Sequence, residues 1–287
     1  MQTGTGHRFF STARDAFAAL GCPVHLHPKD DTARIAAARR DGYSLFYVSD
    51  MRHPRTLDVR PVGIGPFYRM ERARYRADFR MTRMPYDPRE VPGDKARSFF
   101  RIWERLATRP VPDPPFRDHV LVALQGRLLS HRRGQSMSPL DMIRQTLAQE
   151  RDRAIVLKLH PAEVYTRRER AALDAVLTDL RVHLFDGDLD EVLAPCAYVV
   201  TQNSTVALKG MLYRKPAVLF ADCDFHHICP SLRRGMTPAE AFAAVRAAPP
   251  DVERYLYWFL QCHSINTSRD WAAAQIVEHA RHFGWKI

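Results

Sequence analysis

The second half of the chain alternates between two kinds of segment. Short apolar runs are separated by longer stretches in which apolar residues recur at helical spacing. This alternation is typical of βαβ units, and it predicts a Rossmann-like parallel sheet with right-handed crossovers. The expected strands are HVLVALQ (119–125), AIVLKLHP (154–161), RVHLFDG (181–187), AYVVTQ (197–202) and PAVLFAD (216–222). The expected helices are 138–151, 166–180, 188–196 and 204–215, with three closing stretches near 237–248, 251–262 and 270–283.

The first third of the chain also has an α/β pattern, although a less regular one. Helical spacing over 9–21 ends at a glycine, and DDTARIAAARRDG (30–42) begins with aspartates that can cap a helix. The expected strands are PVHLHP (23–28), YSLFYVSD (43–50) and, as a third, RPVGIGPFYRM (60–70).

Between Met81 and Asp118 the pattern gives way to prolines and charges around one short helical piece, 96–107. Such a stretch is typical of an interdomain connection. For a chain of 287 residues we therefore expect two domains. The expected division is an N-terminal α/β domain over 1–80, a linker over 81–118 and a C-terminal domain over 119–287.

Composition adds a constraint on partners. Apolar residues make up 46% of the chain and charged residues 26%, which excludes extensive disorder. The formal charge of +11 favours an anionic partner, and a nucleic acid, an acidic polysaccharide, a nucleotide or an anionic membrane would all qualify. The basic residues are scattered among acids and apolar residues, as on solvated helix faces. We therefore do not expect a nucleic-acid partner.

No apolar run is long enough to span a membrane, and the N-terminus lacks the pattern of a secretory signal. We expect a cytoplasmic protein. The five cysteines form no CxxC pair. CDFHHIC (223–229) places two histidines between two cysteines, but this spacing matches no common zinc pattern. A packed turn is the favoured interpretation, and no metal is expected.

The candidate chemistry lies where strands end, because ligands of open α/β sheets bind beyond the carboxyl ends of the strands. Gln125 follows the first strand of this half, and Lys158 and His160 follow the second. Two residues apart on a strand, Lys158 and His160 would share one face, with Pro161 ending the ladder. The alternative is a solubilising lysine beside a core histidine.

The loop in VVTQNSTVALKG (199–210) favours a ligand-binding role for Lys158 and His160 over the structural alternative. Asn203 or Ser204 occupies the position of a helix N-cap, so free N–H groups and the Thr205 hydroxyl would face the same crevice. A helix N-terminus of this kind binds phosphate readily, although the residues could also simply cap the helix. A lysine, a histidine and a helix start together could stabilise a departing phosphate without a metal.

KLHPAE (158–163), paired with TQNSTVALKGMLYRKPAVLF (201–220) and preceded by VLVALQ (120–125), resembles the C-terminal half of the capsule polysaccharide biosynthesis family. That family includes β-Kdo transferases. The resemblance covers roughly residues 119 to 225. It implies a GT-B-like α/β fold with two Rossmann-like domains facing across a cleft, the N-terminal one small or divergent here.

The resemblance also implies a function, a metal-independent inverting glycosyltransferase of capsule or surface polysaccharide synthesis. No cofactor is implied beyond a nucleotide-activated sugar as substrate, CMP-Kdo or a related CMP-sugar. The implied acceptor is a glycan or glycolipid, with possible peripheral contact with the inner membrane. The residues implied to bind the donor phosphate or nucleotide are Gln125, Lys158, His160, Asn203, Ser204 and Thr205, with His160 also catalytic.

One element of the family pattern is missing. Family members carry an acidic pair before a Gly-aromatic-x-Arg segment, but in GIGPFYRM (63–70) Ile64 and Gly65 occupy those places. Asp50, at the end of an expected strand, is the best replacement for the catalytic base. Glu71 and Asp78 are the next candidates, and each of these acids could be structural instead.

The missing acids leave two other functions open. A catalytically silent relative could keep the nucleotide or glycan site and act in capsule assembly. A nucleic-acid-binding function is supported by the charge alone. It predicts an affinity for DNA or RNA that depends steeply on salt, and it is the least favoured of the three functions.

Overall fold

The computed structural model describes residues 6–28, 30–49 and 53–287. The chain forms two compact units. One comprises Met81–Tyr257, and the other comprises Met1–Arg80 together with Trp258–Ile287. The C-terminal domain was expected over 119–287, but the corresponding unit begins and ends earlier in the chain. The presumed linker belongs to the second unit, and the last residues of the chain return to the first.

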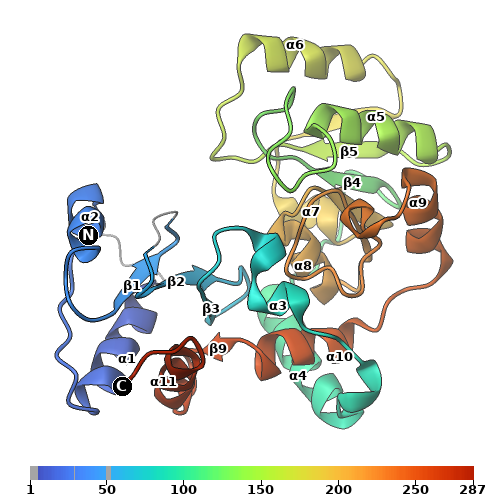
Figure 1. The fold of residues 1–287 in the computed structure, drawn as a ribbon. Coiled ribbons are helices and arrows are strands. Elements are labelled where there is room, and N and C mark those ends of the chain that lie inside the picture. Colours follow the sequence, from blue (N-terminus) through green and yellow to red (C-terminus); the bar gives the residue numbers. More distant parts are fainter. Residues whose placement is uncertain (1–5, 29, 50–52) are drawn as a thin grey trace. The chain divides into compact units, whose positions relative to one another are not determined.

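The second unit is built on a parallel sheet of five strands, as the alternation predicts (Figure 1). The strand order is β6-β5-β4-β7-β8, and every neighbouring pair is parallel. The order reverses between β4 and β7, the position at which ligands bind in doubly wound sheets. The strands are β4 (Val120–Ala123), β5 (Ile155–Lys158), β6 (Val182–Phe185), β7 (Tyr198–Thr201) and β8 (Ala217–Leu219).

The helices around the sheet begin where the sequence offers a cap. Ser138 caps α5, with a proline at the first helical position, and Thr166 and Thr237 form capping boxes with Glu169 and Glu240. The helices around the sheet are α5 (Pro139–Gln149), α6 (Arg167–Val176), α7 (Leu189–Leu193), α8 (Thr205–Leu212) and α9 (Pro238–Ala247).

Strand alternation divides the core of the second unit between the two faces of the sheet. Val120, Val122, Ile155 and Leu157 point into one buried cluster, which includes residues of α5, α6 and α9. On the other face α8 packs against β7, and a Cβ added at Gly210 would lie 3.3 Å from Val199. Both faces are therefore covered, which explains why these strands are apolar throughout.

The segment that we expected to be a linker is structured. It contains α3 (Arg80–Arg83), a 3₁₀ turn η2 (Pro88–Glu90) and α4 (Gly93–Ala107). α4 packs against α8 and against α10 (Val252–Leu256), which continues as a π-helical turn η4 (Tyr257–Cys262). A second 3₁₀ turn in this unit is η3 (Leu232–Arg234).

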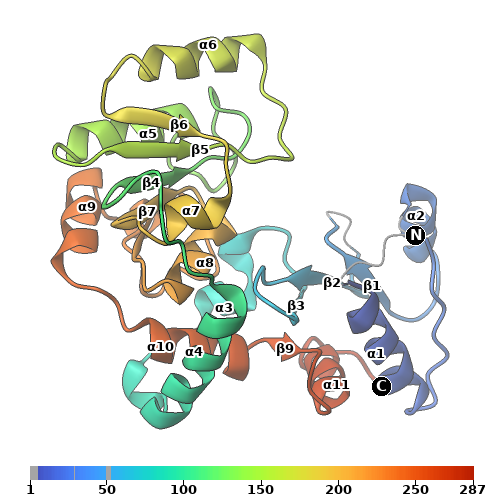
Figure 2. The same cartoon turned by 180° about the vertical axis from the view of Figure 1, so that it is seen from behind.

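The first unit has a mixed sheet in the order β1-β2-β3-β9 (Figure 2). Only the pair β1 and β2 is parallel. The expectation of a second Rossmann-like domain is therefore wrong for this unit. Its strands are β1 (Ser44–Tyr47), β2 (Thr56–Pro61), β3 (Phe67–Glu71) and β9 (Ile265–Asn266), and its helices are α1 (Gly6–Ala18), α2 (Asp31–Ala37), η1 (Arg76–Asp78) and α11 (Ala272–His282).

Two sequence expectations fail in this unit for local reasons. Residues 23–28, expected as a strand, pair with no strand among the described residues. The stretch 60–70 is not one strand but a hairpin, since β2 ends at Pro61 and glycines with positive φ at 63 and 65 turn the chain back into β3. Two long-range contacts bring the last residues of the chain into this unit, because β9 pairs with β3 and α11 packs on α1.

Within the described residues, no helix combines the length and the apolar character that crossing a membrane requires.

A buried histidine predicts how stability depends on pH. His119 is fully buried beside the Val192 carbonyl (2.8 Å from Nε2), and burial lowers its pKa to about 4 from 6.5. Between these two values the unfolded chain binds a proton that the folded protein does not. Stability should therefore fall as the pH drops below 6.5, by about 2 kcal/mol at pH 5. Urea unfolding at pH 7 and pH 5 measures this difference in the free energy of unfolding. In the His119→Phe variant the difference should be about 2 kcal/mol smaller. An unchanged pH dependence in the variant would exclude His119 as its source.

Candidate functional site

The carboxyl ends of three neighbouring strands form one row. Lys158 at the end of β5 and Thr201 at the end of β7 are both in register with Ala123, which ends β4 between them. Adjacent strands are about 4.8 Å apart, so the two outer strand ends lie about 10 Å from each other. A single nucleotide could span this row, which includes the reversal point of the sheet.

His160 lies just beyond the row rather than on a strand. The strand β5 ends at Lys158, two residues earlier than the histidine, so the expected shared face does not apply. The side chain is exposed, and its Nδ1 accepts a hydrogen bond from the Ala162 N–H (3.2 Å). An accepting nitrogen carries no proton, so the neutral ring bears its proton on Nε2. His160 therefore offers one N–H donor to a ligand.

Tyr165 fixes the backbone of this loop. Its hydroxyl accepts a hydrogen bond from the His160 N–H (3.0 Å). Burial raises the pKa of Tyr165 above its ordinary value, so the phenol stays neutral at physiological pH. The exposed imidazole is thus carried by a buried, hydrogen-bonded aromatic residue. This arrangement differs from the core histidine that we considered as the alternative.

Lys158 has a structural contact as well as a position in the row. Its ammonium donates to the Gly187 carbonyl (2.6 Å) and lies 5.5 Å from the centre of the Phe185 ring. Since an ammonium has three N–H donors, this bond leaves two for a ligand. Lys158 therefore links the loop after β6 to the strand end of β5.

The start of α8 matches the expected N-cap. Ser204 is the cap, and its Oγ accepts from the Val206 N–H (3.3 Å), which leaves the hydroxyl proton available. Thr205 is the first helical residue and is partly exposed. Asn203 is not the cap; its amide donates to the Asp222 carbonyl (3.0 Å) and so ties this loop to the end of β8.

Gln125 follows β4 and is partly exposed, and the next residue makes a close contact. A Cβ added at Gly126 would lie 2.0 Å from Glu163 Oε2, so a larger residue there would displace the Glu163 side chain. Arg132 donates to the Gly126 carbonyl (3.3 Å) and to Glu163 Oε1 (3.4 Å). These contacts join the loop after β4 to the loop that carries His160.

Hydrogen bonds hold the loop after β4 near both of its ends. The carboxylate of Glu169, in the capping box of α6, accepts from the Leu128 N–H (2.7 Å). Farther along, both the N–H and the hydroxyl of Ser136 donate to the Phe220 carbonyl (2.8 and 2.7 Å). The loop therefore runs from β4 across to β8 and borders the row of strand ends.

Asp222 also belongs to this region, although it was not among the residues expected from the sequence. Asp222 follows β8 and forms an ion pair with Arg233 (3.3 Å), while its N–H donates to the Gly134 carbonyl (2.7 Å). The rule that selected the other residues, a polar side chain after a strand, would also have selected Asp222. From the sequence, Glu163 could contact a ribose hydroxyl but is expected to be a surface acid; in the structure its carboxylate lies against Gly126 and accepts from Arg132 (3.4 Å).

The acids considered as a catalytic base belong to the first unit. Asp50 lies outside the described residues. Glu71 is buried and accepts from the Arg80 N–H (3.1 Å), whereas Asp78 is exposed. A further buried acid, Asp58, is the cross-strand partner of Glu71 and pairs with Arg60 (2.5 Å).

The two positions that would carry the family's acidic pair lie in the turn between β2 and β3. Ile64 is buried there, and Gly65 has a φ of 48°. Neither supplies a carboxylate.

The histidines of CDFHHIC are engaged in packing. His227 contacts the Tyr255 hydroxyl through Nδ1 (3.1 Å) and the Met84 carbonyl through Nε2 (3.0 Å), so neither ring nitrogen is left for a metal. His226 stacks on it and contacts the Cys223 carbonyl through Nδ1 (2.8 Å). Among the described residues, no three His, Cys, Asp or Glu side chains form a group that could hold a metal. These contacts favour the packed turn.

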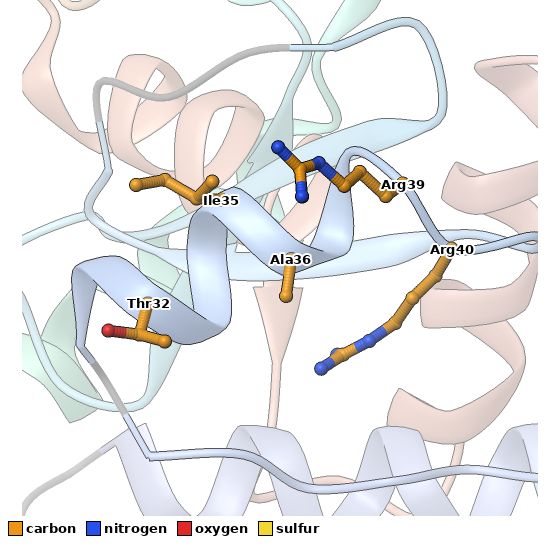
Figure 3. Close-up of a pocket in the computed structure, with 5 residues that line it drawn as sticks. All are labelled: Thr32, Ile35, Ala36, Arg39 and Arg40. Atoms are coloured by element: carbon orange, nitrogen blue, oxygen red, sulfur yellow. The ribbon is translucent and has the colours of Figure 1, made fainter.

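A surface hollow of about 420 Å³ lies elsewhere, in the first unit (Figure 3). It is lined by residues in and just after α2, namely Thr32, Ile35, Ala36, Arg39 and Arg40. None of these residues belongs to the strand ends described above. The candidate site therefore rests on the row of strand ends and not on this hollow.

Comparison with known proteins supports the fold. No family model and no curated protein matches the sequence. Among solved structures, the chain is similar to a KpsC β-Kdo 2,7 transferase of Thermosulfurimonas dismutans, with 12% identity, a TM-score of 0.54 and 95% of each chain covered. It also matches the KpsC β-Kdo 2,4 transferase of that organism, with 13% identity, a TM-score of 0.45, and 85% of this chain and 89% of that chain covered. The chain thus has a fold like that of the β-Kdo 2,7 transferase.

Proposed function

We propose that this chain is a metal-independent inverting glycosyltransferase that uses a nucleotide-activated sugar in capsule or surface polysaccharide synthesis. The observation that carries the proposal is that β5, β4 and β7 end in register, with Lys158 at the end of β5 and with Gln125, His160 and Ser204 in the loops that follow these strands. The Kdo-transferase-like fold adds support. We further propose that the donor is CMP-linked, as CMP-Kdo or a related sugar, and that the second unit binds this donor while the first unit serves the acceptor.

In the proposed site the donor phosphate lies against the row. His160 donates from Nε2, Lys158 supplies positive charge, and Ser204 and Thr205 donate from the start of α8. Asn203 holds that loop, and Gln125 lies near the nucleotide. Hydrogen bonds already hold Lys158, Ser204 and the backbone at His160, so these groups can stabilise negative charge that develops on a leaving phosphate with little reorganisation.

The proposed reaction is a direct displacement. The oxygen of the acceptor hydroxyl forms a bond to the anomeric carbon while the bond from that carbon to the phosphate oxygen breaks. The electron pair of the breaking bond leaves with CMP, and the acceptor proton passes to a carboxylate base. For this base we propose Asp50, with Glu71 and Asp78 as the alternatives. The acceptor would be a glycan or glycolipid, reached by peripheral contact with the inner membrane.

The turn between β2 and β3 favours a second candidate function. Ile64 and Gly65 stand where the resembling family has its acidic pair, and neither can accept a proton. A relative that binds the nucleotide or the glycan but does not transfer sugar, and acts in capsule assembly, would have no need of that pair.

A screen of activated sugars separates the two candidates. Full-length protein is incubated with CMP-, UDP-, GDP- and CDP-sugars in the presence of EDTA, and both binding and nucleotide release are measured. The enzyme predicts tight binding of one nucleotide and release that EDTA does not reduce. Binding without release, under conditions in which acceptor glycans are supplied, would favour the silent relative. Failure of every nucleotide to bind would contradict the enzyme and the nucleotide-binding form of the silent relative.

A further inference from the structure

The outward face of α4 combines positive charge with exposed aliphatic side chains. α4 packs against α8 and α10 at the edge of the second unit (Figures 1 and 2). It buries Ala96, Phe99 and Phe100 on the side that faces them. The helix is therefore held firmly by one face, and its other face is presented to the surroundings.

Most of the cations on this face have no counter-ion. Asp94 is paired with Arg97, and Glu104 is paired with Arg214, so both acids of the helix are already engaged. Among the described residues, the exposed Lys95, Arg101 and Arg105 have no carboxylate partner. Their three positive charges remain available for an external anion.

Two aliphatic side chains lie among these cations. Ile102 is 44% exposed and Leu106 is 66% exposed. Residues four positions apart are neighbours on a helix surface, so the two form one small apolar patch. Lys95 precedes Ile102 by two helical turns, and Arg105 follows it by about one turn. Cations therefore flank the apolar patch. Exposed apolar residues flanked by lysine and arginine are typical of helices that lie on membrane surfaces.

We propose that this face of α4, comprising Lys95, Arg101, Ile102, Arg105 and Leu106, docks the protein on an anionic lipid bilayer. The cations would contact the headgroups, and the two aliphatic side chains would enter the boundary with the acyl chains. A polyanion such as a nucleic acid would engage the cations but gain little from Ile102 and Leu106. No residue of the face belongs to the candidate donor site, so the proposal does not depend on sugar transfer.

The charge requirement is tested by vesicle co-sedimentation of the full chain. Vesicles of phosphatidylcholine with phosphatidylglycerol should bind the protein, and pure phosphatidylcholine should not. The triple variant Lys95→Gln, Arg101→Gln, Arg105→Gln should bind about 100-fold more weakly, since each cation near an anionic surface contributes a factor of about five. A control variant with the same charge loss uses the exposed Arg151, Arg167 and Arg168, each changed to Gln. Equal weakening by both triple variants would overturn the proposal, as would absent binding of the unchanged protein.

The apolar requirement is tested by a matched pair of single variants. Leu106→Ser should weaken vesicle binding several-fold because it removes an inserted side chain. Leu180→Ser removes a leucine that is 93% exposed on another part of the unit and should change nothing. If Leu106→Ser has no effect while the triple variant loses binding to vesicles and to heparin alike, the face binds soluble polyanions instead, and the membrane proposal fails. CMP affinity, measured on the same variants, should stay unchanged in every case, which keeps this test separate from that of the proposed function.

Discussion

The variant His160→Ala is expected to slow sugar transfer by about 10²–10³-fold, the usual effect of deleting one preorganised donor to a developing anion. The fold should survive, because the imidazole is exposed and contributes one weak hydrogen bond to the Ala162 N–H. The melting temperature should therefore change little while CMP affinity falls. His160→Gln should restore part of the rate, since its amide can donate from near the position of Nε2.

Two controls sharpen this test. His131→Ala removes an exposed histidine from the neighbouring loop after β4 and should leave transfer and CMP affinity unchanged. Lys158→Ala should slow transfer as His160→Ala does, and Lys158→Arg should do so less, because the charge remains while the geometry changes. Unchanged CMP affinity in His160→Ala together with a clear loss of stability would contradict the phosphate role and, with it, the proposed transferase.

The variant Glu169→Ala is expected to lose about 3 kcal/mol of stability and to weaken donor binding. Its carboxylate is buried and completes the capping box of α6, and it also accepts from Leu128 in the loop after β4. Losing the cap costs about 1 kcal/mol, and losing a buried bond to a charged acceptor costs about 1.5–3 kcal/mol. Chemical denaturation and CMP titration measure the two effects.

Glu240→Ala is the matched control, because Glu240 completes the same capping box with Thr237 at the start of α9. Glu240 is exposed, so its loss should cost less stability and leave CMP affinity unchanged. If the two variants lose the same stability and neither changes CMP affinity, the bond to Leu128 does not order the site.

Hydrogen bonds from Thr166 and Leu128 lower the pKa of Glu169. The contribution of Glu169 to stability should therefore be complete above the ordinary pKa of the group and decline as the pH falls below it.

Much of the second unit could be predicted from the sequence. Its strands are buried on both faces, so they are apolar runs, and its helices carry caps such as Ser138 and Thr166 that act within a few residues. The positions of Gln125, Lys158 and Ser204 follow from the same reasoning, because the residue after a strand is a local feature. Strand β5 nevertheless ends before His160, since pairing and not sequence pattern decides where a ladder stops.

The first unit was predicted less well because its structure depends on distant partners. β3 pairs with β9, a strand of only two residues that no periodicity would reveal, and α11 packs on α1 from the other end of the chain. The stretch 60–70 contains strand residues on both sides of a glycine turn, and its apolar content alone does not separate one strand from a hairpin.

The sequence by itself determined the parallel sheet of the second unit, a helix cap at Asn203 or Ser204 and the polar residues after its strands, because periodicity, capping and strand ends are local properties of the chain. Only the tertiary structure decided which loops meet. Glu163 lies against Gly126, Glu169 binds Leu128, and Lys158 donates to Gly187, each across a gap in the sequence that no local pattern spans. The return of the C-terminal residues to the first unit was decided in the same way, because pairing of β9 with β3 depends on backbone groups that every sequence carries.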